Sequence, residues 1–237
     1  MKLYLAPLEG ITNHIYRKAL YECFGGFDKY FIPFIRAKQN LNFSGREKKD
    51  IDPENNHGMY AVPQILTRNA EDFLHTASQL AGLGYREINL NLGCPSKTVV
   101  TKGCGAGFLE RPDELERFLD YIFANTDLKI SIKTRLGMDD AEEFEDLLEI
   151  YNRFPLEELI VHPRVQKDFY KNIPNLEAFE HAVQKSKNLL CYNGDIFSAE
   201  DCKSAGTFSV CRVFYDGTRC AGAAFSCKRD SRRKAGR

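Results

Sequence analysis

The sequence has 237 residues, of which 43% are hydrophobic and 28% charged, and its 33 basic and 33 acidic residues balance to a formal net charge of zero. This composition is ordinary for a globular chain and argues against a disordered chain or a fibrous repeat. A membrane protein is not expected either, because no stretch reaches the roughly 18 apolar residues of a spanning helix. Pro7 and Glu9 come too early for a signal-peptide core, so a cytoplasmic location is expected. The 8 cysteines are then expected to be free thiols.

Short apolar runs alternate along the chain with amphipathic stretches. The apolar runs predict strands over Leu3–Pro7, Tyr30–Ile35, Tyr60–Leu66, Glu87–Leu92, Lys129–Lys133, Leu159–His162 and Leu189–Asn193. The amphipathic stretches predict helices over His14–Cys23, Ala70–Leu83, Pro112–Ala124, Ala141–Phe154 and Asn175–Lys185. Two helix-start signals stand out: Pro112 suits a first helical turn, and Ser198 with Asp201 resembles a capping box.

Strands that alternate with helices predict βα units around a parallel sheet. Seven such units precede residue 200, one fewer than a (β/α)8 barrel needs. The predicted fold class is therefore α/β, of the (β/α)8 TIM-barrel type, and incomplete. A doubly wound sheet is the alternative, but Leu8–Thr12 is not the glycine-rich turn that such sheets place after their first strand.

Polar residues end nearly every predicted strand. In a parallel barrel these ends meet at one face, where binding and catalytic groups gather. Each residue alone has an ordinary explanation, since Gln64 suits a turn and His162 a buried core position. Their recurrence at the same end of successive strands predicts a site there, made of Pro7, Gln64, Asn91, Cys94, Lys133, Arg135, His162, Arg164, Asn193, Gly194 and Asp195.

Several of these segments resemble the tRNA-dihydrouridine synthases, a family of flavin enzymes built on a barrel. The matching segments, in the family's order and spacing, are Leu5–Thr12, Asn89–Lys97, Gly103–Gly107, Ile132–Gly137, His162–Arg164 and Asn193–Ile196. The resemblance covers roughly residues 3–200. Its most specific element is the Cys94-Pro95 pair with the preceding Asn91.

The resemblance implies FMN at the barrel mouth, NADPH as reductant, and reduction of a uridine in tRNA to 5,6-dihydrouridine, without a metal. It implies Cys94 as the proton donor, because a thiol stays largely protonated at neutral pH and can still donate. Asn91, Arg135 and Arg164 are implied to bind substrate. The implied cofactor site consists of Pro7, Leu8, Glu9, Gln64, Lys133, His162, Asn193, Gly194 and Asp195.

Two loops carry further expectations. The glycines of Gly103–Gly107 suggest a lid that bends freely and carries Cys94. The loop Arg36–His57 is rich in Arg and Lys, so it is expected either to contact RNA phosphates or to be an ordinary solvated loop.

Residues 201–237 depart from the family pattern. They hold nine basic and three acidic residues, a charge of +6, which leaves −6 on residues 1–200. The family's eighth strand with its Met-x-Gly-Arg-Gly motif and its C-terminal helical domain are not found in residues 202–237. The sequence therefore predicts a partial FMN-binding barrel over 1–200 and a poorly ordered Cys/Arg-rich tail over 201–237.

A shift of one base across the degenerate codons of Phe214–Ala221 permits Phe-Met-Met-Gly-Arg-Gly, which suggests a frameshift shortly after residue 200. A seven-stranded barrel would have two open edges, so such a chain is expected to bind FMN weakly, to aggregate and to be inactive. Two alternatives stay open: a flavin barrel acting on a free pyrimidine, as dihydroorotate dehydrogenases do, and a non-catalytic remnant.

Overall fold

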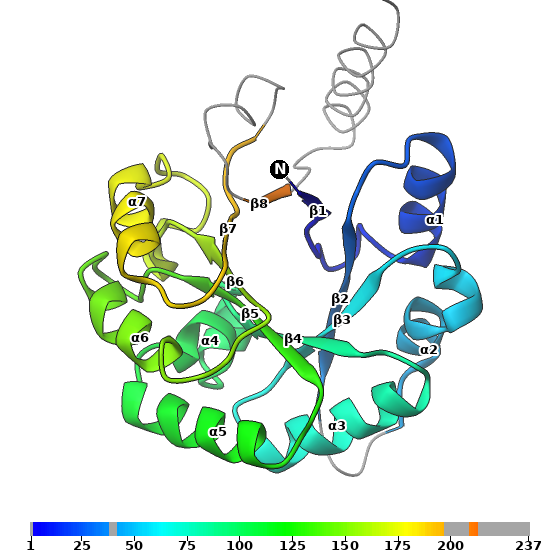
Figure 1. The fold of residues 1–237 in the computed structure, drawn as a ribbon, viewed down its shortest axis with the longest axis horizontal. Helices are drawn as coiled ribbons and strands as arrows, with labels where there is room; N and C mark the ends of the chain where they lie inside the picture. Colours follow the sequence, from blue (N-terminus) through cyan, green and yellow to red (C-terminus); the bar gives the residue numbers. More distant parts are fainter. Residues whose placement is uncertain (1, 38–41, 197–208, 213–237) are drawn as a thin grey trace, which may run out of the picture.

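The computed structural model describes residues 2–37, 42–196 and 209–212. Its parallel strands follow one another around a closed barrel in sequence order, and the helices lie outside them (Figure 1). The strands are β1 Leu3–Leu5, β2 Lys29–Arg36, β3 Ala61–Leu66, β4 Glu87–Leu92, β5 Lys129–Arg135, β6 Glu158–His162, β7 Leu190–Tyr192 and β8 Ser209–Arg212. This arrangement confirms the predicted barrel fold class.

The helices occupy most of the connections between strands. The α-helices are α1 His14–Cys23, α2 Gly45–Ile51, α3 Ala70–Gly82, α4 Lys97–Val100, α5 Pro112–Ala124, α6 Glu143–Tyr151 and α7 Leu176–Lys185, and the short 3-10 helices are η1 Pro53–Asn56, η2 Gly105–Phe108 and η3 Gln166–Asp168. All five predicted helices and all seven strands predicted before residue 200 are present. The short helices α2 and α4 carry too few residues to show a periodic pattern.

Strand β8 corrects the expectation that no strand follows residue 202. Its backbone pairs in parallel with β1, where Tyr4 lies opposite Cys211, and with β7, where Tyr192 lies opposite Val210. Pairing on both sides closes the sheet, so the open edges expected on β1 and β7 are absent from this structure. The four residues of β8, Ser-Val-Cys-Arg, neither alternate between apolar and polar nor form an apolar run, which is why the sequence did not reveal the strand.

The eighth unit is still incomplete in the described residues, where only its strand is seen. The remainder of the predicted tail and the capping box expected at Ser198 and Asp201 lie outside the described residues. No described helix is long and apolar enough to cross a membrane. Within the same residues, no three His, Cys, Asp or Glu side chains are grouped so that they could hold a metal ion.

The outer helices pack by burying one face against the strands. In α5, the residues at helical spacing Leu115, Phe118, Leu119 and Ile122 are buried, and the Phe118 ring meets Phe73 of α3 edge-on at 5.8 Å. Burial of each such side chain stabilises the fold by about 1.5–3 kcal/mol. Pro112 occupies the first turn of this helix, as predicted.

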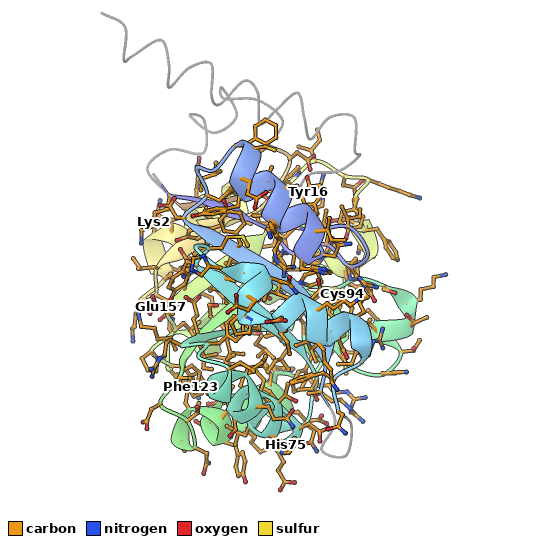
Figure 2. All side chains as sticks on the ribbon, turned by 90° about the vertical axis from the view of Figure 1, so that its right-hand side faces the viewer. Lys2, Tyr16, His75, Cys94, Phe123 and Glu157 are labelled. Carbon is orange, nitrogen blue, oxygen red and sulfur yellow. The ribbon has the colours of Figure 1, made fainter. Side chains whose placement is uncertain are left out.

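The two ends of the barrel are chemically distinct. Figure 2 shows Lys2 and Glu157, which precede β1 and β6, on one side of the molecule, and Cys94, which follows β4, on the other. The carboxyl ends of the strands therefore face the side that carries Cys94.

Candidate active site at the carboxyl end of the barrel

A cavity of about 520 Å³ opens at the carboxyl ends of the strands. This volume lies within the range of pockets that hold cofactors and small substrates. The structure brings every residue predicted for the site to its wall, namely Pro7, Leu8, Glu9, Gln64, Asn91, Cys94, Lys133, Arg135, His162, Arg164, Asn193, Gly194 and Asp195. Their individual roles stay predictions.

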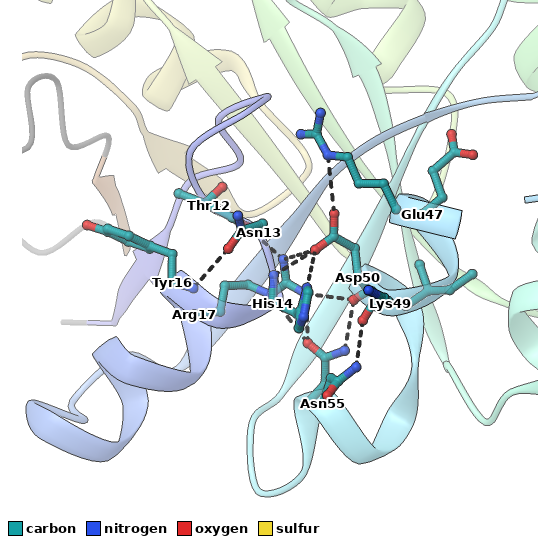
Figure 3. Close-up of polar contacts among 12 residues, drawn as sticks. Thr12, Asn13, His14, Tyr16, Arg17, Glu47, Lys49, Asp50 and Asn55 are labelled. Atoms are coloured by element: carbon teal, nitrogen blue, oxygen red, sulfur yellow. Dashed lines mark hydrogen bonds and ion pairs between the residues drawn. The ribbon is translucent and has the colours of Figure 1, made fainter. Parts of the chain in front are cut away.

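The segment from Pro7 to Glu9 is held in place by a buried arginine on α1. Arg17 is fully buried and donates from Nη1 to the Thr12 carbonyl at 2.7 Å and from Nη2 to the Asp50 carbonyl at 2.6 Å (Figure 3). Burial lowers the pKa of Arg17 to about 10, which still leaves it charged at neutral pH. Thr12 in turn accepts the Leu8 N–H at 2.8 Å, so Arg17 anchors the loop that lines the cavity.

A row of buried amides crosses the cavity floor from β3 to β5. Asn91 donates to Gln64 Oε1 at 2.7 Å, and Gln64 donates to Asn89 Oδ1 at 2.7 Å. Asn89 then donates to Ser131 Oγ at 2.9 Å. Because each amide has a donor and an acceptor in use, the row fixes the orientation of Gln64 and Asn91.

Asn91 also shapes the loop that carries Cys94. Its Oδ1 accepts the N–H groups of Gly93 at 3.1 Å and Cys94 at 3.0 Å, which turns the chain immediately after β4. The predicted substrate contact of Asn91 therefore coexists with a structural role that is visible in the fold.

The expected Gly103–Gly107 lid has a different geometry. A Cβ atom at Gly105 would lie 2.8 Å from the Cys94 carbonyl oxygen, and one at Gly107 would lie 2.6 Å from the Val100 carbonyl oxygen. The Ala106 N–H donates to the Cys94 carbonyl at 3.1 Å. These glycines permit close backbone packing in and beside the buried helix η2, and the lid role of Gly103–Gly107 stays a prediction.

The Cys94 thiol is half-buried, and its surroundings shift its pKa in opposite directions. Burial raises its pKa, the Ser96 N–H lowers it, and Glu9 raises it again. Lys133 and Arg135 lower it by their positive charge, but the net pKa remains above the ordinary value. The thiol is therefore protonated at neutral pH, in reach of groups that stabilise its conjugate base.

His162 is held neutral on the wall formed by β6. Burial lowers its pKa well below the ordinary value, and the charges of Arg135, Lys133 and Arg164 lower it further. Arg164 Nη1 lies 2.9 Å from His162 Nε2, and because an arginine can only donate, Nε2 accepts and the ring proton is on Nδ1. Arg164 also binds both carboxylate oxygens of Asp195, at 2.8 and 2.9 Å.

Arg135 is buried to 1% exposure and its donors are directed at the protein backbone. It donates to the carbonyl oxygens of Gly93 at 3.0 Å, Val165 at 2.9 Å and Phe169 at 2.7 Å. The predicted substrate role of Arg135 stays a prediction, and the structure gives it a further role in joining the loops after β4 and β6.

Part of the cavity wall was not predicted from the sequence, namely Phe34, Gly93, Pro95, Ser96, Phe169 and Tyr170. Phe34 lies within a shift of the β2–β3 register between Ile32 and Ile35, which is not visible in the sequence. Phe169 has a φ of +51°, a strained conformation for a non-glycine residue. The Cys94-Pro95 motif could have indicated that Pro95 and Ser96 also line the cavity.

The sequence is similar to those of known proteins. A "Probable tRNA-dihydrouridine synthase" of Staphylococcus aureus strain Mu50 is 31% identical over 201 residues, which cover 81% of this chain and 60% of the relative. A "tRNA-dihydrouridine(16) synthase" of Cupriavidus necator is 28% identical over 218 residues, covering 89% and 67%. The chain thus spans about 60% of the length of the first of these relatives.

The solved structures support the fold alone. A GH18 chitinase from Pseudoalteromonas aurantia superposes with a TM-score of 0.60 at 12% identity, covering 98% of this chain and 100% of the chitinase chain. The family model for dihydrouridine synthase (Dus) matches residues 4–211, a range that runs from β1 into β8. The chain therefore belongs to the dihydrouridine synthase family.

Proposed function

We propose that this chain reduces a uridine of tRNA to 5,6-dihydrouridine, with FMN as cofactor, NADPH as reductant and Cys94 as the proton donor. The observation that carries the proposal is a protonated, half-buried Cys94 thiol on the wall of a cavity lined by every residue of the family motifs predicted for the site. Family membership and the names of the relatives support the same reaction.

The cavity has the size and the donors that FMN requires. Lys133 supplies a positive charge on the wall, and the proton on His162 Nδ1 makes that nitrogen a hydrogen-bond donor. Pro7 and Leu8 would border the flavin ring, Gln64 and Lys133 its polar edge, and His162 with Asn193–Asp195 the phosphate side. When bound, FMN would supply the hydride that C6 of the uracil needs, because no side chain can.

The side chains of the cavity would then perform the acid part of the reaction. Cys94 would donate its proton to C5 of the uracil, and Lys133 and Arg135 would stabilise the thiolate that is left. Asn91, whose amide is fixed by Gln64, would hold the edge of the base. A stacked uridine hides its C5–C6 bond, so the nucleotide must flip into the cavity.

A group of exposed cations beside the cavity favours a polyanionic substrate over a free pyrimidine. Arg36 ends β2, Arg68 follows β3, and Lys102 follows α4; we call these three residues the basic rim. The positive charges of all three lower the pKa of the Cys104 thiol. The Arg36 guanidinium lies 5.7 Å from the centre of the Phe34 ring, and Phe34 lines the cavity.

No ion pair of the basic rim with a carboxylate is present among the residues that the structure describes. Arg46, in contrast, lies 3.9 Å from the Asp50 carboxylate. Two arginines of the predicted basic loop therefore differ: Arg36 lies against Phe34 of the cavity wall, whereas Arg46 takes part in an intramolecular pair.

The direct test of the proposed function is a turnover assay. The purified chain is incubated with FMN, NADPH and unmodified tRNA transcript, and dihydrouridine is measured by mass spectrometry of the digested RNA. Because β8 closes the barrel and removes the open edges from which inactivity was expected, we expect dihydrouridine to form in tRNA, with no reduction of free uridine or orotate. Reduction of orotate without reduction of tRNA would favour the free-pyrimidine alternative.

Lys133→Met is expected to slow flavin reduction by NADPH by roughly 10²-fold and to lower the flavin potential, because a charge that stabilises anionic reduced flavin is removed. Stopped-flow absorbance measures the rate, and Lys167→Met is the control, since Lys167 is exposed on η3 and does not line the cavity. An unchanged flavin potential in Lys133→Met would place this amine away from the flavin.

Replacing the basic rim residues Arg36, Arg68 and Lys102 together by serine is expected to weaken tRNA binding. The slope of log K against log salt should become shallower by about 2–3, because each lost phosphate contact removes roughly one released counterion. Filter binding over a salt series measures this slope.

The matched control removes the same charge from the opposite end of the barrel. Lys2 precedes β1, Arg86 precedes β4 and Lys129 begins β5, and all three are exposed. Their triple serine variant should keep the wild-type slope. Equal slopes in the two triple variants would show that only net charge matters and that the basic rim does not contact RNA.

A further inference from the structure

The backbone around Cys94 is held by hydrogen bonds from separate parts of the chain. The carbonyl of Gly93 accepts from Arg135 Nε at 3.0 Å, and that of Cys94 accepts from the Ala106 N–H at 3.1 Å. The carbonyl of Pro95 accepts from Gln166 Nε2 at 3.0 Å. Three consecutive carbonyls are thus fixed from β5, η2 and η3.

Gln166 reaches this loop from a position that is itself fixed. It begins η3, its N–H donates to the Gly137 carbonyl at 2.9 Å, and its own carbonyl accepts the Phe169 N–H at 3.1 Å. The side chain is half-buried and does not line the cavity. Gln166 can therefore influence the site through Pro95, without touching a substrate in the cavity.

The bond to Pro95 acts on the same peptide group that contacts the Cys94 thiol. The Pro95 carbonyl and the Ser96 N–H belong to one planar unit, so fixing the oxygen fixes the direction of the N–H. The Ser96 N–H is near enough to the Cys94 sulfur to lower the pKa of that thiol. Donation to the carbonyl also polarises the peptide and strengthens the N–H as a donor.

We infer that Gln166 is a positioning residue for Cys94, which orients the Pro95–Ser96 peptide so that its N–H stays directed at the sulfur; this inference rests on the role proposed above for Cys94. The other charged groups that act on the sulfur are Glu9 from the loop after β1 and Lys133 and Arg135 from β5. Replacing Gln166 removes none of these three charges.

The test uses Gln166→Leu, which keeps the approximate size but has no donor, and Gln166→Asn, which is one methylene too short to reach Pro95. The rate of Cys94 alkylation by iodoacetamide is measured against pH, with the Cys94 peptide quantified by mass spectrometry. Because the Ser96 N–H stabilises the thiolate, both variants should move the midpoint upward by roughly 0.5–1 pH unit. Lys167→Met is the control and should keep the wild-type midpoint.

Turnover gives the second measurement. In both variants kcat for tRNA should fall about tenfold with KM and bound flavin unchanged, because a displaced acid loses its alignment while the cavity wall stays intact. An alkylation midpoint that does not move, or moves downward, would overturn the inference. A variant that only loses thermal stability, with its midpoint and kcat unchanged, would overturn it too.

The alkylation assay needs neither tRNA nor flavin, so it separates this inference from the proposed function. An upward midpoint shift without dihydrouridine formation in any form of the protein would support the role of Gln166 and contradict the reaction.

Discussion

Cys94→Ala is expected to lose nearly all reduction of tRNA while the barrel remains folded and its cavity keeps its other walls. Removing a general acid slows the acid step by about 10²–10⁴-fold. The loop should survive the change, because its position depends on the backbone hydrogen bonds of Gly93, Cys94 and Pro95 rather than on the sulfur. Dihydrouridine formation in a single turnover, measured by mass spectrometry, gives the rate.

Cys104→Ala is the matched control for this experiment. Cys104 is also a half-buried free cysteine with a pKa raised by burial, but it does not line the cavity. It should keep wild-type turnover, and flavin reduction by NADPH should be normal in both variants. Wild-type turnover in Cys94→Ala would show that another group supplies the proton.

The location of the site could be predicted from the sequence because the carboxyl ends of all strands lie at the same end of a parallel barrel. Gln64 lies near the end of one predicted strand, Lys133 ends another and His162 ends a third, and parallel strands in a barrel bring such ends to one face. In the structure these residues line the same cavity. The motifs added the pairing of Cys94 with Asn91, which the structure explains by the hydrogen bonds from Gly93 and Cys94 to Asn91 Oδ1.

The parts that sequence analysis missed depend on contacts between distant segments. The bond from Gln166 to Pro95 joins residues 71 positions apart, and no local pattern announces it. Strand β8 exists through its pairing with β1 and β7, not through its own composition. Phe34 reaches the cavity beside an irregularity in β2, where strict alternation of side chains breaks down.

A second feature hidden from sequence analysis is a charged cluster at the amino end of the barrel. Lys29, Glu87 and Glu158 begin β2, β4 and β6, and each is at most 8% exposed. Lys29 Nζ lies 2.9 Å from Glu87 and 3.4 Å from Glu158. Tyr60 and Tyr4 donate hydrogen bonds to the same two carboxylates, at 3.1 and 2.9 Å. In the sequence, charged residues at the start of a strand look like solvent-exposed residues. Their burial becomes evident only in the closed barrel.

Lys29→Met is expected to destabilise the protein by about 3–5 kcal/mol at neutral pH, because it leaves two buried carboxylates without their counter-charge. Glu158→Gln should change stability little, since Lys29 keeps Glu87 and Tyr4 can still donate to the amide oxygen. Urea unfolding followed by circular dichroism measures both, with the free energy of unfolding taken by linear extrapolation.

The pH dependence of the Lys29→Met variant tests the electrostatic origin of this effect. Burial raises the pKa of Glu158 above its ordinary value even though Lys29 lowers it, so ionising this carboxyl costs stability as the pH rises through the folded pKa. Without Lys29 the pKa rises further, and the variant should regain stability relative to wild type as the pH falls from 7 towards about 5. The double variant Lys29→Met/Glu158→Gln should recover part of the loss at pH 7. A loss that is the same at both pH values, and that Glu158→Gln does not relieve, would mean that lost packing around Lys29 causes it and that the charge cluster does not.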